Sequence, residues 1–287
     1  MRYVATIGFF DGVHIGHRYL LSELRRVASE RSMQSAVITL DEHPQAVLAG
    51  NVQLLLTTVK ERDELLQQNK IDEVFLFRFD VIRSMTALEF MRIIHEQYGV
   101  DILLMGYDHR FGSDRLTNFD DYKRCAEQVG IELIAINESP QGAISSSKIR
   151  TALLNGEIEE ANKMLGYSYY LSGKVVHGNG IGRTIGFPTA NIEPAPCKLI
   201  PKAGVYSGKM LLFGASNPLR CLVNIGTNPT VGNERTTIEA YLPDYSGGDF
   251  YGTTITLFFT RRIREERKFD SLDALRAQIA TDIQTVD

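Results

Sequence analysis

The sequence predicts two domains, an N-terminal α/β domain with a parallel sheet and a C-terminal small antiparallel β-barrel that ends in a helix. The chain has 287 residues, of which 44% are hydrophobic, and this is enough for two cores. Its first part alternates apolar strand-like runs with amphipathic helical segments. From about Tyr169 the pattern changes to segments punctuated by glycine and proline, in which apolar and polar residues alternate.

The first domain contains five expected strands. They cover residues 4–10, 36–40, 74–79, 102–105 and 131–136, and a helix starts at about Gly16. Continuous apolar strands separated by helices are typical of a parallel sheet that is covered on both faces. Such a sheet binds ligands at the carboxyl ends of its strands, so motifs that directly follow a strand are the candidates for function.

The second domain is expected to be a barrel because a period of two is visible in its strands. The period is clearest at Thr253, Ile255, Leu257 and Phe259, and a final helix starts at Leu272. Residues 147–165 read as a connecting helix that is interrupted at residues 155–156. We therefore predict domains at 1–166 and 167–287.

Composition and charge narrow the classes of function. Three cysteines without a CxxC pair suggest neither disulfides nor a thiolate zinc site, and no apolar run reaches eighteen residues, so we expect a cytoplasmic protein without a membrane partner. A formal net charge of -4 gives no general reason to bind nucleic acid. The basic run at 261–264 is followed by Glu265 and Glu266, which favours a solvated strand end over a nucleic-acid patch.

The first candidate site is the segment GFFDGVHIGH at residues 8–17, where the first strand ends and the first helix begins. A helix start offers unpaired N–H groups, and two glycines let phosphate oxygens approach the backbone. His14 and His17 could donate to a triphosphate and stabilise charge on the departing pyrophosphate. Two other interpretations stay open: the histidines and Asp11 could be metal ligands, or the segment could be only a turn.

Two further segments also follow predicted strands. ISSSKIR at 144–150 opens the connecting helix, so its serines either cap that helix or form an anion site with Lys148 and Arg150. GYDHRFGSDR at 106–115 either contacts a nucleotide, orders a lid or is a surface turn.

Together the three segments resemble the FMN adenylyltransferase domain of bacterial bifunctional riboflavin kinase/FAD synthetases, which belong to the Rossmann-like HxGH nucleotidylyltransferase superfamily. The resemblance implies attack by the FMN phosphate on the α-phosphate of ATP, with His14, His17 and Arg150 as catalytic residues. It implies cofactor-binding residues at Gly8, Phe10, Asp11, Gly12, Gly16, Asp108, Arg115, Ser146 and Ser147. Family members usually carry Phe in place of His109, Thr in place of Ser147, and a leading segment before the first strand.

A glycine-rich run, HGNGIGRTIGFPTAN at 177–191, dominates the second domain. It fits neither GxGxxG nor GxxxxGK[ST]. Pro188 fixes the backbone, so Thr189 and Asn191 can present oxygen atoms from one face of an extended segment, which suits Mg²⁺. Glu239 lies on a later strand and could act as a general base. The alternatives are a turn closed by Thr and Asn and a glutamate that faces solvent.

This run and the segments GVY at 204–206 and NIGTNPTVG at 224–232 resemble riboflavin kinases. The resemblance implies ATP and Mg²⁺ at Thr189 and Asn191, and Glu239 as the group that activates the terminal ribityl hydroxyl. It also implies a glycine-rich flap from Gly178 to Gly186 over the phosphates, and cofactor binding at Gly180, Gly182, Gly186 and Pro188.

The predicted function is therefore to convert riboflavin to FMN and FMN to FAD, with ATP as co-substrate. The chain is then expected to be a transferase with small-molecule partners. Two competing hypotheses remain. One is another adenylyltransferase or cytidylyltransferase fused to a flavin kinase, and the other is a flavin-binding regulatory protein that has lost its chemistry.

Overall fold

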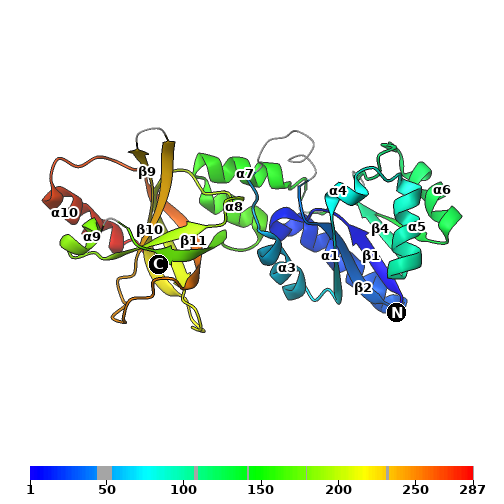
Figure 1. The fold of residues 1–287 in the computed structure, drawn as a ribbon, viewed down its shortest axis with the longest axis horizontal. Coiled ribbons are helices and arrows are strands. Elements are labelled where there is room, and N and C mark those ends of the chain that lie inside the picture. Colours follow the sequence, from blue (N-terminus) through cyan, green and yellow to red (C-terminus); the bar gives the residue numbers. More distant parts are fainter. Residues whose placement is uncertain (44–53, 107–108, 141, 179, 231–232, 287) are drawn as a thin grey trace. The chain divides into compact units, whose positions relative to one another are not determined.

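The chain folds into two compact units, Met1–Ser146 and Ser147–Asp287 (Figure 1). The computed structural model describes residues 1–43, 54–106, 109–140, 142–178, 180–230 and 233–286. The connecting segment forms α7 (Ser146–Asn155) and α8 (Ile158–Leu165), with a break at Gly156, where φ is 83°. Apart from Ser146, these helices fall in the second unit, whereas the sequence analysis assigned them to the first domain. The boundary between the functional domains stays a prediction.

The first unit is built on a five-stranded parallel sheet, as predicted. Its strands lie in the order β3-β2-β1-β4-β5, and each neighbouring pair is parallel. They are β1 (Tyr3–Ile7), β2 (Gln34–Leu40), β3 (Glu73–Phe77), β4 (Val100–Gly106) and β5 (Glu132–Ile136). The chain places β2 and β3 on one side of β1 and then crosses to place β4 and β5 on the other. The reversal between β1 and β4 is where sheets of this kind bind ligands.

Helices alternate with these strands. They are η1 (Asp11–Val13), α1 (Ile15–Glu30), α3 (Val59–Gln68), α4 (Phe79–Ile82), α5 (Ala87–Tyr98) and α6 (Phe119–Val129). Capping boxes start two of them: Thr58 with Glu61 in α3, and Thr86 with Glu89 in α5. Buried side chains of β1, β2 and β4 join those of α5 and α6 in one core. This core holds the strand ends that carry the first candidate site.

The second unit contains a closed barrel with the strand order β10-β7-β6-β11-β8-β9, and all its pairs are antiparallel. The elements are β6 (Tyr170–Val176), α9 (Ile181–Thr184), β7 (Thr189–Pro194), β8 (Gly204–Leu211), β9 (Leu219–Thr230), β10 (Asn233–Tyr241), β11 (Thr254–Arg264) and α10 (Leu272–Ile283). Ile255, Leu257 and Phe259 are buried on the inner face of β11. The predicted period of two and the predicted final helix are therefore confirmed.

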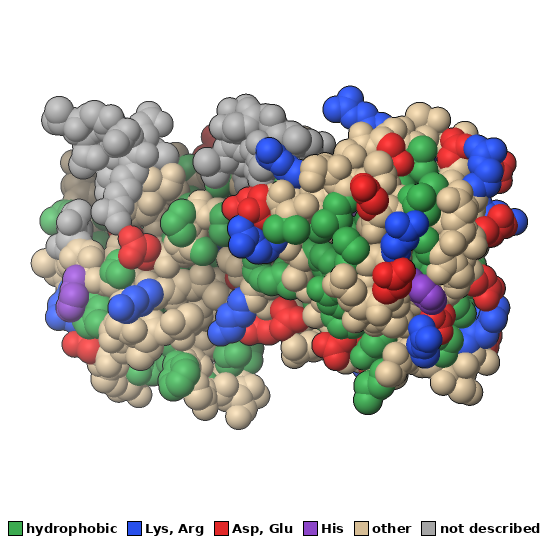
Figure 2. Space-filling model, turned by 45° about the vertical axis from the view of Figure 1, so that its right-hand side comes forward, with side chains coloured by type: hydrophobic (Ala, Val, Ile, Leu, Met, Phe, Trp, Pro, Cys, Tyr) green, Lys and Arg blue, Asp and Glu red, His purple; other side chains and the backbone are tan. Residues whose placement is uncertain are grey.

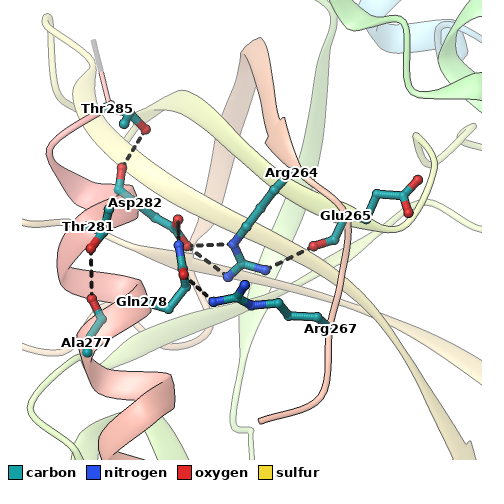
Figure 3. A network of polar contacts seen from close by, with 8 residues as sticks. All are labelled: Arg264, Glu265, Arg267, Ala277, Gln278, Thr281, Asp282 and Thr285. Atoms are coloured by element: carbon teal, nitrogen blue, oxygen red, sulfur yellow. Dashed lines mark hydrogen bonds and ion pairs between the residues drawn. The ribbon is translucent and has the colours of Figure 1, made fainter.

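An ion pair holds α10 on the barrel. Nε and Nη2 of Arg264 donate to Oδ2 of Asp282 at 3.0 and 2.8 Å (Figure 3), and Asp282 is 2% exposed. Gln278 Nε2 donates to the other carboxylate oxygen at 2.6 Å. The prediction that residues 261–264 form a solvated strand end is wrong for Arg264, because its partner comes from a helix that is distant in sequence.

The surface carries both signs of charge. Figure 2 shows Lys and Arg side chains interspersed with Asp and Glu on the visible face, without a continuous basic area. This mixing follows from a chain with 31 basic and 35 acidic residues. Within the described ranges, no helix has both the length and the apolarity needed to cross a membrane.

Candidate active sites

A tight turn follows β1, leads into α1 and presents the first candidate site. Phe10 has left-handed backbone angles (φ 55°, ψ 33°), and Gly12 has a φ of 78°. The turn places His14 at the N-cap of α1, where its Nδ1 accepts a hydrogen bond from the backbone N–H of His17 at 3.3 Å. The helix start adds a partial positive charge, which favours an anion.

His14 and His17 lie face to face, with ring centroids 3.7 Å apart and an angle of 15° between the planes. Burial lowers the pKa of His14 to about 4, although the carboxylate of Asp11 opposes this. Burial, followed by the rings of His14 and His109, holds the pKa of His17 well below its usual range. Both imidazoles are therefore neutral at pH 7. Because Nδ1 of His14 accepts a hydrogen bond, its proton lies on Nε2.

The histidine pair has spare capacity to bind a ligand. Nδ1 of His17 is enclosed, and it has no hydrogen-bond partner among the described residues. Unpaired buried polar atoms are uncommon in proteins, and each one calls for an explanation such as a bound group. A phosphate beside the rings would raise both pKa values, because a negative charge favours the protonated imidazole. The pair is thus suited to bind a polyphosphate and to stabilise charge that develops on it.

Asp11 holds the turn in place through the chain that leads into α3. Its carboxylate accepts hydrogen bonds from the backbone N–H of Leu56 at 3.1 Å and from the N–H and hydroxyl of Thr57 at 2.9 and 3.1 Å. Thr57 Oγ1 in turn accepts from the N–H of Gly12 at 3.0 Å. Within the described residues, no group of three His, Cys, Asp or Glu is arranged to hold a metal ion. These contacts support a structural role for Asp11, and a contact between Asp11 and a nucleotide stays a prediction.

The serine segment reaches the same turn. Ser146 Oγ donates to the backbone carbonyl of Asp11 at 2.9 Å. The backbone carbonyl of Ile144 lies beside Gly16, where an added Cβ would stand 3.7 Å from it. Ser147 and Arg150 belong to the second unit, and their approach to the histidines stays a prediction.

The loop after β4 contributes a third imidazole. His109 lies close enough to His17 to contribute to the lowered pKa of that residue. Asp114 anchors the loop by accepting a hydrogen bond from the first N–H of α5 at 3.0 Å. Arg115 is exposed, with a φ of 51°, and Asp108 lies outside the described residues. The segment at 106–115 was selected from the sequence because it follows a predicted strand, but His109 itself was given no separate role.

The second candidate site lies on the barrel strands β7 and β10. Thr189 and Asn191 share one face of β7, and Asn191 is directly opposite Glu239 in the antiparallel register. Thr189 Oγ1 donates to Oε2 of Glu239 at 2.9 Å. The structure therefore brings together the three residues that the sequence analysis selected.

Close packing explains the glycines before β7. A Cβ at Gly178 would stand 2.0 Å from Nδ2 of Asn191, and a Cβ at Gly182 would stand 2.3 Å from the carbonyl oxygen of Phe187. Gly180 and Gly186 have φ values of 70° and 88°, which favour glycine. The glycine-rich run therefore lies directly against a predicted magnesium ligand.

A cavity of about 520 Å³ opens beside these residues, and this volume is in the range of small-molecule sites. Its lining includes His177, Gly180, Arg183, Pro188, Thr189 and Asn191. The segment after β10 lines the same cavity. The ring of Tyr251 stacks on His177 with centroids 3.9 Å apart, and Asp249 pairs with Arg183 at 3.4 Å. Sequence reasoning missed these two contacts because they join residues more than sixty positions apart.

Comparisons with known proteins match each half of the chain to a family of its own. A family model described as FAD synthetase matches residues 1–149, and one described as riboflavin kinase matches residues 165–287. A solved structure of a macrolide-efflux protein from Streptococcus pneumoniae is 32% identical, with a TM-score of 0.89 over 99% of this chain and 94% of that one. The whole chain therefore shares its fold with that protein.

Relatives of established description extend over nearly the whole chain. The bifunctional riboflavin kinase/FMN adenylyltransferase of Escherichia coli K12 is 37% identical over 97% of this chain and 90% of its own length. The protein of the same description from Bacillus subtilis is 33% identical over 98% of this chain and 90% of its own length. The chain therefore belongs to the family of bifunctional riboflavin kinase/FMN adenylyltransferases.

Proposed function

We propose that the chain makes FAD in two steps at two separate sites. The second half phosphorylates riboflavin to FMN with ATP, and the first half transfers the adenylyl group of a second ATP to FMN. Each half matches its own family model. The observation that carries the proposal is that each half also assembles its own polar cluster, the stacked His14–His17 pair in the first and the Thr189–Glu239 pair in the second.

In the first half, an oxygen of the FMN phosphate attacks the α-phosphorus of ATP, the bond from that phosphorus to the bridging oxygen breaks, and pyrophosphate leaves. The neutral imidazole of His14 donates a hydrogen bond from Nε2 to the triphosphate, and the ring of His17 stacks on the ring of His14. Because the rings are held by burial and by the start of α1, they need no reorganisation as negative charge moves to the leaving group. Ser146, Ser147 and Arg150 are proposed to complete this site.

In the second half, Glu239 accepts the proton of the terminal ribityl hydroxyl, whose oxygen then attacks the γ-phosphorus of ATP, and ADP leaves. The carboxylate is held in place by Thr189, which donates to it at 2.9 Å. This hydrogen bond uses the proton of Thr189 and leaves its oxygen lone pairs for a cation. The flap that contains Gly180 and Gly182 is proposed to cover the phosphates.

Magnesium fits the second site. Thr189 and Asn191 offer neutral oxygen donors on one face of β7, and Mg²⁺ is usually held by few protein oxygens together with substrate phosphates. The ion would neutralise phosphate charge during transfer. We further propose that the protein acts in the cytoplasm on riboflavin, FMN and ATP, without nucleic-acid or membrane partners. Its free cysteines support a reducing compartment.

The test is chromatographic separation of riboflavin, FMN and FAD after incubation of the purified protein with riboflavin, ATP and Mg²⁺. We expect FMN first and FAD after it. FMN without FAD would favour another nucleotidyl acceptor for the first half. Unchanged riboflavin would favour a binding protein that has lost its chemistry.

A further inference from the structure

Arg62 on α3 is a buried cation that the mechanism above does not use. Its side chain is 1% exposed. Its Nη2 donates to the backbone carbonyl of Leu40, the last residue of β2, while its Nη1 is enclosed and has no hydrogen-bond partner in the described part of the chain. The guanidinium carbon stands 4.4 Å from the centroid of the Phe9 ring.

The surroundings of Arg62 leave its charge largely uncompensated. Burial lowers its pKa to about 10, and the attraction of Asp11 and Asp41 offsets only part of this effect. Both carboxylates are occupied elsewhere: Asp11 accepts from Thr57, and Asp41 accepts from the N–H of Phe79 at 2.9 Å. No carboxylate of the described residues forms an ion pair with Arg62.

A purely structural role does not account for this arrangement. Burying a charge costs free energy unless it is paired and fully hydrogen-bonded, and an apolar side chain of similar size is often at least as stable. An enclosed donor that lacks a partner suggests that a bound group supplies one. The planar guanidinium and its N–H donors match the oxygen atoms of a phosphate.

The strand order places Arg62 on a particular side of the site. β1 has β4 on one side and β2 on the other. The loop with His109 follows β4, while Arg62 contacts the end of β2 and the residue Phe9 just after β1. Ligands of such sheets bind at the switch point, which here lies between β1 and β4. If ATP binds there, the β2 side is the one left for the second substrate.

We infer that Arg62 binds the phosphate of the flavin substrate through Nη1 during adenylyl transfer. This inference rests on the proposed function of the first half. Because the guanidinium carbon lies 4.4 Å from the centroid of the half-buried Phe9 ring, we expect the phosphate to reach Nη1 when that ring turns aside, a rotamer change within the ordinary repertoire of partly exposed side chains. Arg62 thereby holds the attacking oxygen, and the His14–His17 pair holds the triphosphate.

The test compares Arg62→Met, which keeps most of the side-chain volume, and Arg62→Lys, which keeps the charge, with the wild type. Arg92→Met is the matched control, since Arg92 is exposed on α5. FAD formation is measured while either FMN or ATP is varied. FMN formation from riboflavin by the same chains reports that the second half is intact, and urea unfolding reports on the first unit.

For Arg62→Met we expect the KM for FMN to rise about tenfold to a hundredfold, as for the loss of one charge-assisted hydrogen bond. The KM for ATP should change by less than about twofold, and Arg62→Lys should be intermediate. An unchanged KM for FMN in both variants would overturn the inference. So would an equal rise in both KM values together with a lower urea midpoint, which would mean a structural role. If Arg62→Met does not fold, Arg62→Lys carries the test. A wild type that forms no FAD from FMN would instead refute the proposed function.

Discussion

Replacing His14 by Asn should remove part of the acid sensitivity of the first unit. In the folded chain, burial lowers the pKa of His14 to about 4, against an ordinary value of 6.5. As the pH falls from 6.5 towards 4, the unfolded chain takes up a proton at His14 that the folded chain excludes. The free energy of unfolding therefore decreases in this window. At pH 7.5 and above the side chain is almost entirely neutral in both states, and it contributes almost no pH dependence.

The size of the effect follows from the two pKa values. The difference between about 4 and 6.5, at about 1.4 kcal/mol per pKa unit, gives a full loss of about 3 kcal/mol. At pH 5 about 2 kcal/mol of this loss is expressed, and at pH 7.5 almost none. Urea unfolding at these two pH values, followed by pulse proteolysis that reports the two units as separate fragments, measures the difference.

Between pH 7.5 and pH 5, the free energy of unfolding of the first unit should fall by about 2 kcal/mol less in His14→Asn than in the wild type. Burial is the largest cause of the low pKa of His17 and acts in both proteins, so most of the acid loss caused by His17 cancels in the comparison. His177→Asn, in the second unit, is the control and should leave the first-unit transition unchanged. Equal acid losses in wild type and His14→Asn would refute the reasoning that burial keeps His14 neutral.

Two further predictions concern residues that position each site. Gly178→Ala should reduce FMN formation about tenfold or more without loss of FAD formation from supplied FMN, because the new Cβ would stand 2.0 Å from Nδ2 of Asn191 and displace that side chain. The control is Gly248→Ala, whose new Cβ would have no atom within 4 Å and which should match the wild type. A Gly178→Ala variant with full FMN formation would contradict the role of Asn191. Asp11→Asn should destabilise the first unit by about 3 kcal/mol and slow adenylyl transfer, because it removes the carboxylate charge from the group that accepts hydrogen bonds from Thr57. Urea unfolding with pulse proteolysis measures the stability of the first unit, and an unchanged urea midpoint would contradict the prediction.

The fold was predictable because its signals are local. The apolar runs of the five strands and the period of two in β11 are properties of short segments, and each was confirmed. The key side chains were also selected from the sequence, those of the first site from motifs that follow strands and those of the second site from a glycine-rich run and a predicted strand. Thr189, Asn191 and Glu239 meet on neighbouring strands, and His14 and His17 stack at a helix start. The stacking of His14 and His17 is local to a helix start, whereas Glu239 lies fifty positions from Thr189 and was selected through the resemblance to riboflavin kinases.

Features that depend on tertiary partners were not predictable. Asp11 is satisfied by the backbone 45 and 46 positions later, so the sequence could not show that its carboxylate holds a turn. Arg264 forms an ion pair with Asp282 on the last helix, and the pattern of neighbouring charges at 261–266 gave no sign of this contact. The burial of Arg62 likewise depends on Phe9 and Leu40, which belong to two other segments.

The most direct test of the central claim, that two independent sites act in one chain, uses Glu239→Gln and His17→Asn separately and mixed. From riboflavin and ATP, Glu239→Gln should form neither FMN nor FAD, yet it should convert supplied FMN to FAD. His17→Asn should stop at FMN. A mixture of the two variants should form FAD from riboflavin. If either variant lost both activities, or if the mixture stopped at FMN, the division of the two reactions between the two halves would be contradicted.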